Sequence, residues 1–515
     1  MYDSLISIRV SRNTSSFLFK KLLLTNTNKY RRKLMKNFGF KHKTGILLSI
    51  SSLPSNYGIG SFGKSAYEFI DFLKETKQTC WQILPLNPTS YGDSPYQSPS
   101  QFAGNPYFID LEFLYEDKLL TKEELDMNIN KSKSIDYGWL FSTRINTLKI
   151  AFSRFIQDED YYKFLIKSDY WLNDYAKFMV LKEKNNYNIW QNFLNFEVLD
   201  EELEFWYFIQ YKFDRQWNNI LEYAHKNNIV IIGDMPIYVA VDSVDVWTNK
   251  EYFLLDDANY PTMVAGCPPD AFSPKGQLWG NPIYNWDKLK EDNFSWWIKR
   301  FKRNIELYDI IRIDHFRGFA GYYAIPYNDT TAEFGKWYSS PGKELFKKVN
   351  ETFPDLRVIA EDLGYITPDV IELLEFTGDP GMKILQFAFY DDDAPFLPRM
   401  YQSSNCVVYT GSHDADCTLS WINNLNIETY ERFEKECLNK TSYTGVYALI
   451  YLALSSIANL SIIPIQDYLC LSNEEGRINT PSIAYGNWTF KLDDNYITTS
   501  LKEKIKNITL LTSRA

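Results

Sequence analysis

The chain has 515 residues, of which 45% are hydrophobic and 17% aromatic, so it is long and apolar enough to bury a large core. Its formal net charge of −10 at pH 7 argues against a nucleic-acid partner, because non-specific binding to phosphates depends on clustered Lys and Arg. A neutral or small ligand is more consistent with this composition, and the flat faces of the many aromatic side chains suit sugar rings as well as a protein core.

Residues 1–40 are predicted to be a basic N-terminal extension. The first 43 residues contain eleven Lys or Arg and one acid, Asp3, which is typical of an organelle transit peptide and would place the protein in a plastid. The alternative, which we favour, is that translation starts at Met35 of a cytoplasmic protein. No apolar stretch here is long enough to span a membrane, so no membrane partner is expected.

Eight short apolar runs rich in Ile, Val and Leu follow, each leading through polar residues into a stretch with helical character. Continuous apolar runs of this length suit parallel strands that are buried on both faces. Eight of them with helices between predict a (β/α)8 TIM barrel over residues 41–515. The runs are residues 44–50, 81–86, 229–239, 309–316, 357–364, 382–389, 406–414 and 461–469.

Two of the gaps between these runs are long. Residues from about 111 to 228 include acidic and aromatic segments such as EELEFWYFIQYKFDRQW, which predict a helical insertion. Residues from about 247 to 300 are rich in Pro, Gly and Trp and predict a loop insertion at the active site, since long loops on a barrel tend to carry function.

The cysteines and histidines indicate neither a metal site nor a disulfide framework. The six cysteines show no CxxC spacing, and the four histidines do not fall at HExxH or a similar spacing. No metal or other cofactor is therefore expected.

Acidic residues follow five of the predicted strands, at the end where barrel enzymes place their active sites. They are Asp234, Asp314, Glu361 with Asp362, Asp414 and Asp467. A single acid at this position often caps a helix, but five that converge are more consistent with a site. Arg312 and Asp314 share one face of their strand, so both are expected to point into the barrel mouth. The adjacent guanidinium is expected to favour the ionised form of Asp314.

Several long motifs surround these acids: IRIDHFRG, IAEDLG, YTGSHDADCTLSW, GDMPIYVAVDSVDVW and GCPPDAFSPKGQLWGNPIYNWD. Together they resemble the motifs of the 4-α-glucanotransferase family, the amylomaltases or disproportionating enzymes of the α-amylase superfamily. The likeness extends from about residue 43 to the C-terminus. It implies a cofactor-free enzyme that moves segments of α-1,4-glucan between maltodextrins by a retaining double displacement.

What the resemblance implies for single residues agrees with the argument from the barrel. Asp314 would be the nucleophile, Glu361 the general acid/base, and Asp414 the third carboxylate, which grips the hydroxyls of the donor sugar. Glu361 must then hold its proton near neutral pH, so we expect burial and neighbouring negative charge to raise its pKa. The positions that correspond to substrate contacts are Ser94, Tyr96, Asp234, Gln277, Trp279, Arg312, His413 and Asn479.

The chain departs from the family pattern beside these motifs. Ala415 and Cys417 stand where the family usually has Asn and Thr. Ser482 replaces a Gly, and Phe490 and Lys491 replace a Trp and an Arg. None of these positions is one of the three carboxylates Asp314, Glu361 and Asp414. An enzyme with weakened activity is nevertheless an alternative, because the departures could change the geometry around those carboxylates.

The loop at residues 266–281 offers the flat side chains of Phe272 and Trp279. We expect it to cover the acceptor side and exclude water, with a structural plug of the barrel rim as the alternative. Two other functions also stay open, a plain α-glucan hydrolase and a catalytically silent glucan-binding protein. The expected partners are maltodextrins and other α-1,4-glucans, and the expected assembly is a monomer or a weak homo-oligomer.

Overall fold

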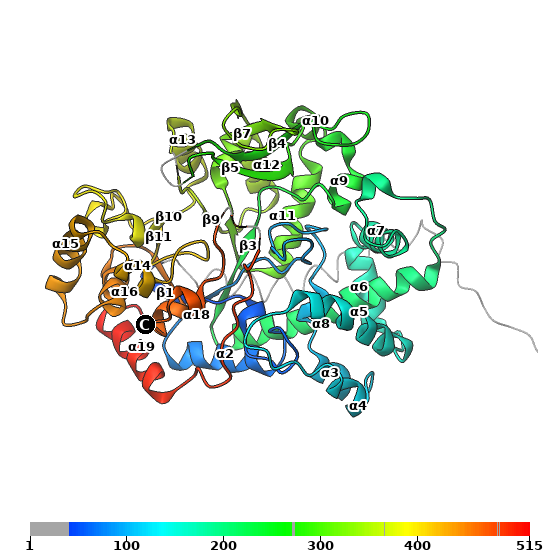
Figure 1. The fold of residues 1–515 in the computed structure, drawn as a ribbon, viewed down its shortest axis with the longest axis horizontal. Helices are drawn as coiled ribbons and strands as arrows, with labels where there is room; N and C mark the ends of the chain where they lie inside the picture. The colour runs from blue at the N-terminus through cyan, green and yellow to red at the C-terminus, as the bar shows by residue number, and fades with distance from the viewer. Residues whose placement is uncertain (1–40, 270–272, 365, 482, 484) are drawn as a thin grey trace, which may run out of the picture. The chain divides into compact units, whose positions relative to one another are not determined.

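The computed structural model describes residues 41–515 except 270–272, 365, 482 and 484. Within that range, eight parallel strands close into a barrel in the order β1-β12-β11-β10-β9-β6-β3-β2 (Figure 1). They are β1 (Lys43–Leu47), β2 (Cys80–Gln82), β3 (Val230–Met235), β6 (Ile310–Ile313), β9 (Val358–Ala360), β10 (Gly381–Ile384), β11 (Cys406–Tyr409) and β12 (Leu460–Pro464). The predicted TIM barrel is confirmed, with one strand in each of the eight apolar runs.

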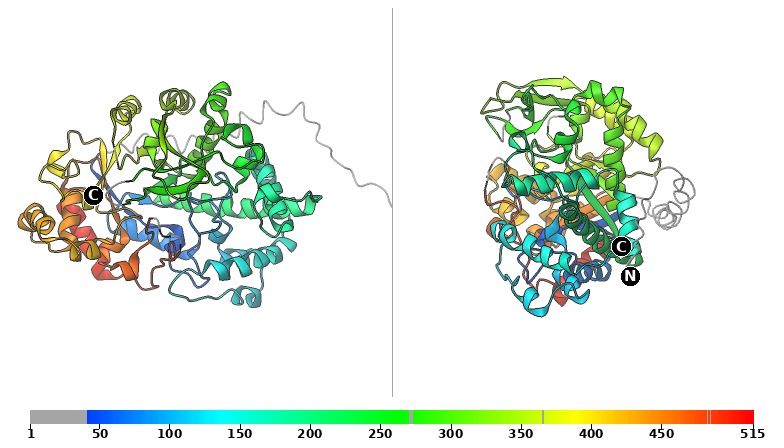
Figure 2. Two further views of the ribbon diagram at one scale, coloured as in Figure 1. Left: turned by 45° about the horizontal axis from the view of Figure 1, so that its top comes forward. Right: turned by 90° about the vertical axis from the view of Figure 1, so that its right-hand side faces the viewer.

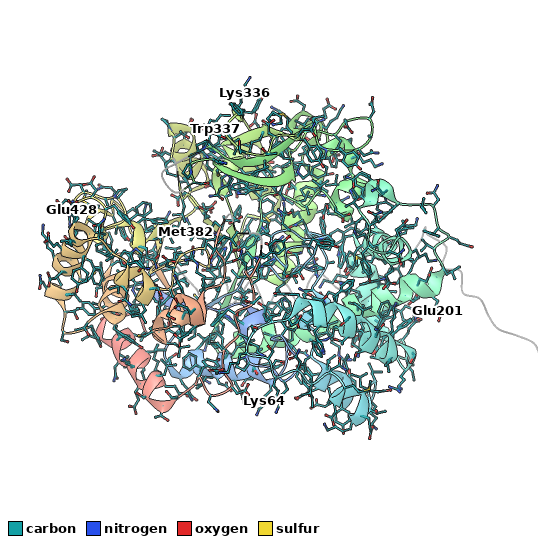
Figure 3. All side chains as sticks on the ribbon, in the orientation of Figure 1. Lys64, Glu201, Lys336, Trp337, Met382 and Glu428 are labelled. Atoms are coloured by element: carbon teal, nitrogen blue, oxygen red, sulfur yellow. The ribbon has the colours of Figure 1, made fainter. Side chains whose placement is uncertain are left out.

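The strands are apolar because the barrel buries them on both faces. Every residue of β3, β6, β9 and β11 is buried, as expected where one face meets the barrel interior and the other meets the helix layer. Figure 3 shows Lys64 and Glu428, both on surrounding helices, at the edge of the molecule, whereas Met382 of β10 lies nearer the middle.

Helices fill most of the chain between β2 and β3. The longest, α8 (Asp200–Lys226), buries aromatic side chains along its length, contacts the helices before it and leads directly into β3. Figures 1 and 2 show these helices gathered on one side of the barrel. The others are α3 (Leu111–Glu116), α4 (Lys122–Asp126), α5 (Tyr137–Ser153), α6 (Glu159–Ser168) and α7 (Leu172–Lys184).

The remaining helices follow the barrel strands along the chain. None of the helices in the described residues is long and apolar enough to cross a membrane. They are α2 (Lys64–Glu75), α9 (Val244–Thr248), α10 (Trp286–Glu291), α11 (Ser295–Leu307), α12 (Gly342–Thr352), α13 (Pro368–Thr377), α14 (Thr418–Asn423), α15 (Ile427–Glu436), α16 (Val446–Ser455), α17 (Ile465–Tyr468), α18 (Asn473–Gly476) and α19 (Thr499–Leu511).

A second, antiparallel sheet lies outside the barrel and was not predicted. Its strands are β4 (Met263–Cys267), β5 (Gln277–Pro282), β7 (Gly321–Pro326) and β8 (Lys336–Ser339), in the order β5-β4-β7-β8. The sheet buries a small apolar cluster around Val264 and Ile325. The interpretation of residues 247–300 as a loop is therefore wrong in part, because they contain β4, β5, α10 and the start of α11. The strand pairing explains the error, since β4 pairs with β7, far along the chain, and local periodicity cannot reveal such a partner.

Three of the features named from the sequence lie outside the described residues: the basic extension over residues 1–40, Phe272 and Ser482.

Candidate active site

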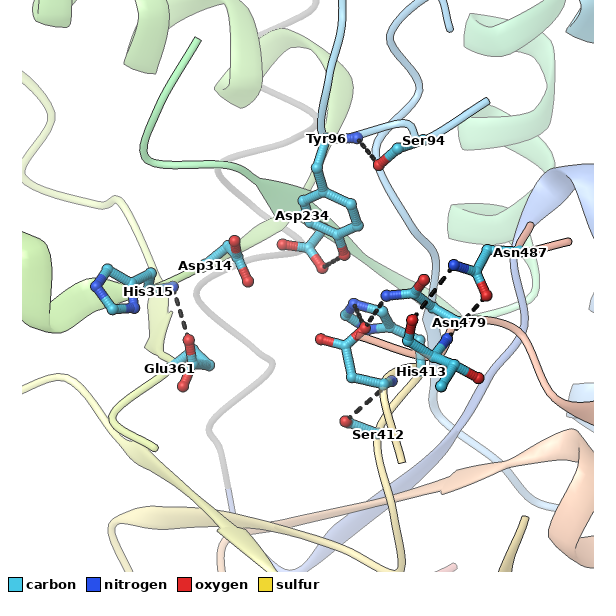
Figure 4. Close-up of polar contacts among 12 residues, drawn as sticks. Ser94, Tyr96, Asp234, Asp314, His315, Glu361, Ser412, His413, Asn479 and Asn487 are labelled. Carbon is cyan, nitrogen blue, oxygen red and sulfur yellow. Dashed lines mark hydrogen bonds and ion pairs between the residues drawn. The ribbon is translucent and has the colours of Figure 1, made fainter. Parts of the chain in front are cut away.

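Four of the acids that the sequence singled out lie together at one end of the barrel, at or just beyond the carboxyl ends of its strands. Asp234 belongs to β3, Asp314 follows β6, Glu361 follows β9 and Asp414 lies in the turn after β11. Backbone hydrogen bonds tie these ends together, from Asp314 N to Met235 O at 3.0 Å and from Glu361 N to Ile313 O at 3.0 Å. Figure 4 shows Asp314 and Glu361 on one side of the site, with His413 and Asn479 across from them.

Arg312 is the buried cation at the centre of this group. Its Nη1 lies 2.7 Å from both carboxylate oxygens of Asp234 and 3.1 Å from Oδ1 of Asp314. The Arg312 and Asp234 side chains are 4% and 0% exposed, so a pair of charges is held away from water and each depends on the other. Tyr96 completes the environment of Asp234, because its hydroxyl donates to Asp234 Oδ2 at 2.9 Å.

Asp314 shows how burial and a neighbouring cation compete. Burial raises the pKa of Asp314 to about 6, while the Arg312 guanidinium opposes the shift and the Asp234 charge adds to it. Arg312 therefore favours the ionised form, as expected, but burial outweighs it. Near neutral pH the carboxylate is still mostly ionised, which a nucleophile requires.

Glu361 is held by two backbone donors. His315 N donates to Oε2 at 2.7 Å and Leu363 N donates to Oε1 at 2.8 Å, so the carboxyl group has a fixed orientation. Burial raises the pKa of Glu361 to about 7, Arg312 opposes this shift and the charge of Asp314 adds to it. The expected direction and cause are both present, and a raised pKa is what a general acid near neutral pH requires.

Asp414 is surrounded by side chains from other loops. Its Oδ1 accepts a hydrogen bond from Asn479 Nδ2 at 2.7 Å and lies 3.4 Å from His413 Nε2. The His413 ring stacks on Tyr96, with ring centres 5.3 Å apart and planes 13° apart. The Trp488 ring lies 5.7 Å from that of Tyr96 and 6.1 Å from that of His413. Together the rings make an aromatic wall next to the carboxylates.

Gln277 and Trp279 reach the site from the second sheet. Both lie on β5, and the indole Nε1 of Trp279 donates to Gln277 Oε1 at 3.1 Å. The Trp279 ring packs edge-on against His315 at 4.8 Å, which places it beside the residue whose backbone holds Glu361. Ser94 has a different position, because its Oγ accepts from Tyr96 N at 3.2 Å and so shapes the turn that carries Tyr96.

Two of the acids grouped with the site point elsewhere. Asp362 accepts a hydrogen bond from Met382 N at 2.6 Å, on the neighbouring strand β10. Asp467 is buried and accepts from the hydroxyls of Thr410 and Thr418 at 2.5 and 2.8 Å and from Thr418 N at 3.0 Å. Both are structural acids that hold neighbouring strands and turns, so the prediction that acids from five strand ends converge is wrong for these two.

Three contributors were missed by sequence reasoning: Trp488, His315 and Arg477. His315 donates its backbone N–H to Glu361, and Arg477 donates to the backbone oxygen of Asp414. Residue type does not reveal contacts that involve backbone groups. Trp488 could have been found, because it lies in the motif GNWTFK next to the departures Phe490 and Lys491.

Several of the departures from the family pattern lie among the described residues and make contacts of their own. Cys417 is buried, and its N–H donates to Asn473 Oδ1 at 2.8 Å. Phe490 and Trp488 line a small cavity beside Ser49 and Tyr137. The Lys491 ammonium donates to Ser55 O at 3.5 Å.

A closed parallel barrel with a nucleophile-like and an acid-like carboxyl group on adjacent strands is the arrangement of a retaining enzyme that acts on glycosidic bonds. No group of three or more His, Cys, Asp or Glu side chains in the described part of the chain is placed to hold a metal ion.

Comparison with known proteins identifies the family within this class. A family model described as 4-alpha-glucanotransferase matches residues 48–498. A 4-alpha-glucanotransferase of Clostridium butyricum is 47% identical over 494 residues, covering 91% of this chain and 100% of that protein. The one from Streptococcus pneumoniae is 42% identical over 495 residues, covering 92% and 98%. The solved structure of an amylomaltase from Streptococcus agalactiae in complex with acarbose superposes with a TM-score of 0.88 at 38% identity, covering 92% of this chain and 100% of that one. This chain belongs to the 4-α-glucanotransferase family.

Proposed function

We propose that this site moves segments of α-1,4-glucan from a donor maltodextrin to the 4-hydroxyl of an acceptor glucose or maltodextrin, by a retaining double displacement. The observation that carries the proposal is the pair Asp314 and Glu361, which follow the paired residues Ile313 and Ala360 at the ends of the neighbouring strands β6 and β9. The two carboxyl groups therefore project from adjacent positions, and burial raises the pKa of both. Retention uses two carboxyl groups that lie close together in this way.

In the first step, the Asp314 carboxylate attacks the anomeric carbon of the donor sugar and the bond to the leaving oxygen breaks. Glu361 gives its proton to that oxygen, so the shortened glucan leaves as an alcohol. The backbone N–H groups of His315 and Leu363 then stabilise the Glu361 carboxylate that remains.

In the second step, the 4-hydroxyl of an acceptor sugar attacks the same carbon from the opposite side. Glu361 takes the hydroxyl proton as the new glycosidic bond forms, and Asp314 departs as a carboxylate. Both groups return to their starting protonation states, so no external oxidant, reductant or cofactor is consumed.

The remaining residues bind the sugars in this proposal. Asp414, with Asn479 and His413 beside it, grips the hydroxyls of the donor sugar. The contact residues assigned to the substrate are Ser94, Tyr96, Asp234, Gln277, Trp279, Arg312, His413 and Asn479. Acarbose, which is present in the neighbouring amylomaltase structure, is expected to compete with maltodextrins here.

We assign this reaction to a catalytic unit over residues 41–515, with residues from about 111 to 228 as a helical insertion. The proposed location is the cytoplasm and the proposed state is a monomer or weak homo-oligomer. Size-exclusion chromatography with light scattering at several protein concentrations tests the state, and a stable tetramer would contradict it.

Incubation with maltotriose tests the proposed activity. We expect glucose together with a ladder of longer maltodextrins on a thin-layer plate, because cleavage of maltotriose that leaves a maltosyl segment on the enzyme releases glucose, and the enzyme then passes that segment to another glucan. Glucose and maltose alone would show hydrolysis instead, and unchanged maltotriose would show a binding protein. The family membership favours the first outcome.

A further inference from the structure

Arg477, which follows α18, contacts three parts of the Asp414 side of the site. Its Nη2 donates to the backbone oxygen of Asp414 at 3.2 Å, and its Nε donates to the backbone oxygen of Asn479 at 2.9 Å. Its Nη1 forms an ion pair with the carboxylate of Asp416. One guanidinium therefore connects the backbone of a site carboxylate with the backbone of the amide that hydrogen-bonds it.

Asn473 fixes the same two segments to each other at a second point. Its Nδ2 donates to Asp416 Oδ1 at 2.8 Å, and its Oδ1 accepts from Cys417 N at 2.8 Å. Its own backbone N–H donates to Ser420 Oγ at 2.9 Å. The carboxylate of Asp416 is thus held between an arginine and an asparagine and cannot swing away from Arg477 without losing both.

The orientation of Asp414 depends on this arrangement. The Asp414 side chain is 43% exposed, and its carboxylate interacts with the side chains of Asn479 and His413. Asn479 is itself tied to the same turn, since its N–H donates to His413 O at 3.2 Å. A shift of the Asn479 backbone relative to that of Asp414 would therefore turn the carboxylate away from the donor sugar.

We propose that Arg477 is a positioning residue for the donor sugar: it fixes Asp414 and Asn479 relative to each other, with Asp416 and Asn473 holding its guanidinium in place. The inference rests on the proposed function, in which Asp414 binds the hydroxyls of the donor. In this proposal Arg477 acts through Asp414 and Asn479, whose backbone oxygens it binds.

Arginine suits this role because its planar group presents several N–H donors in fixed directions. Three acceptors from Asp414, Asn479 and Asp416 surround it, which uses the Nε and both terminal nitrogens. A lysine keeps the charge but offers one nitrogen, so it cannot reach all three acceptors at once. Arg477→Lys should consequently leave the ion pair with Asp416 while releasing one or both backbone contacts.

The test compares α-glucosyl fluoride with its 2-deoxy analogue as single-sugar donors and measures kcat/KM for each. The 2-deoxy donor lacks one of the hydroxyls that Asp414 is proposed to bind. The ratio of kcat/KM for glucosyl fluoride to kcat/KM for the 2-deoxy donor therefore reports how well Asp414 binds the 2-hydroxyl. Asp414→Asn gives the benchmark for losing it. Arg154→Lys is the matched control, because Arg154 also binds one carboxylate, Glu124, and one backbone oxygen, Leu119 O, but lies in the helical segment before β3.

We expect Arg477→Lys to lower the ratio about tenfold, the effect of weakening one hydrogen bond to a charged group. Asp414→Asn should lower it at least as far, and Arg154→Lys should leave it unchanged. Asp416→Asn, which keeps the size of the side chain but removes its charge, should lower the ratio by a smaller factor and provides a second route if Arg477→Lys folds poorly.

Equal losses with both donors in Arg477→Lys and Asp416→Asn, with the ratio unchanged, would overturn the positioning role and leave Arg477 as part of the fold. Full activity of both variants would overturn it as well. An unchanged ratio in Asp414→Asn would contradict the proposed role of Asp414, and the positioning role with it, so the benchmark separates the failure of the proposed function from that of the inference.

Discussion

The two halves of the site are held by different parts of the molecule. Asp314 and Glu361 follow adjacent barrel strands, and the buried Arg312 and two backbone N–H groups contact their carboxyl groups. Asp414 lies in a turn beyond β11, is more exposed than Asp314, and is contacted by side chains from a segment more than sixty residues away. The half that we propose forms and breaks bonds is thus built on the ends of barrel strands, and the half that we propose grips the sugar is built on interlocked loops.

The largest effect is expected at the strand-borne nucleophile. Asp314→Asn should lower kcat by about 10⁴-fold or more with every donor, because no group remains to form the covalent intermediate. The amide keeps the size of the side chain, so the thermal midpoint should stay within a few degrees. Initial rates with maltotriose and with glucosyl fluoride measure the effect, and turnover of either donor above about 1% of wild type would break the assignment.

A smaller and selective loss is expected at Glu361. Glu361→Gln should lower kcat/KM for maltotriose about 10³-fold, since the leaving oxygen no longer receives a proton. Glucosyl fluoride has a leaving group that needs no proton, so this variant should still be glycosylated by it. Asp362→Asn is the matched control, because Asp362 is adjacent in sequence but binds Met382 N instead of facing the site.

Equal losses with both donors in Glu361→Gln would contradict the division of roles between the two carboxyl groups. A comparable loss of kcat/KM for maltotriose in Asp362→Asn would show that any change at this strand end damages the site. The loss in Glu361→Gln could then not be attributed to a missing general acid.

Much of the strand-borne half could be predicted from the sequence. Each of the eight barrel strands overlaps one of the apolar runs, and the position of Asp314 and Glu361 follows once the strand ends are known. The alternation of side chains along IIRIDHF also places Arg312 beside Asp314, and Arg312 Nη1 lies 3.1 Å from Asp314 Oδ1.

The loop-borne half and the second sheet could not be predicted in the same way. Arg477 acts on Asp414 and Asn479 through backbone oxygens, and no pattern of side chains records such contacts. Strand β4 pairs with β7, whose position in space depends on the intervening barrel strand. Asp467 follows a strand as Asp414 does, and only its bonds to Thr410 and Thr418 reveal that it faces away.

The pH dependence should separate the two carboxyl groups of the strand-borne half. Because burial raises the pKa of Asp314 to about 6, kcat/KM should fall as the pH drops below that value and the nucleophile is protonated. Because burial raises the pKa of Glu361 to about 7, kcat/KM should also fall above that value as the acid is lost. With glucosyl fluoride the alkaline fall should disappear and the acid fall should remain. An alkaline fall of equal size with both donors would contradict the assignment of Glu361.

The smallest expected effect is on stability, and it tests whether ionisation of Glu361 in the strand-borne half destabilises the fold. Burial raises the pKa of Glu361 from an ordinary value near 4.5 to about 7, so the folded protein binds this proton more tightly than the unfolded chain does. The resulting stability is fully present below the ordinary pKa and is lost as the pH rises through about 7.

Glutamine has no proton to lose, so Glu361→Gln should show a fall in thermal midpoint between pH 4.5 and pH 8 that is smaller than that of wild type by about 2 °C. Taking the difference between two pH values removes the constant cost of placing an amide against the N–H of Leu363. Differential scanning calorimetry of the two proteins measures these shifts, and equal falls in wild type and Glu361→Gln would show that ionising Glu361 does not destabilise the barrel.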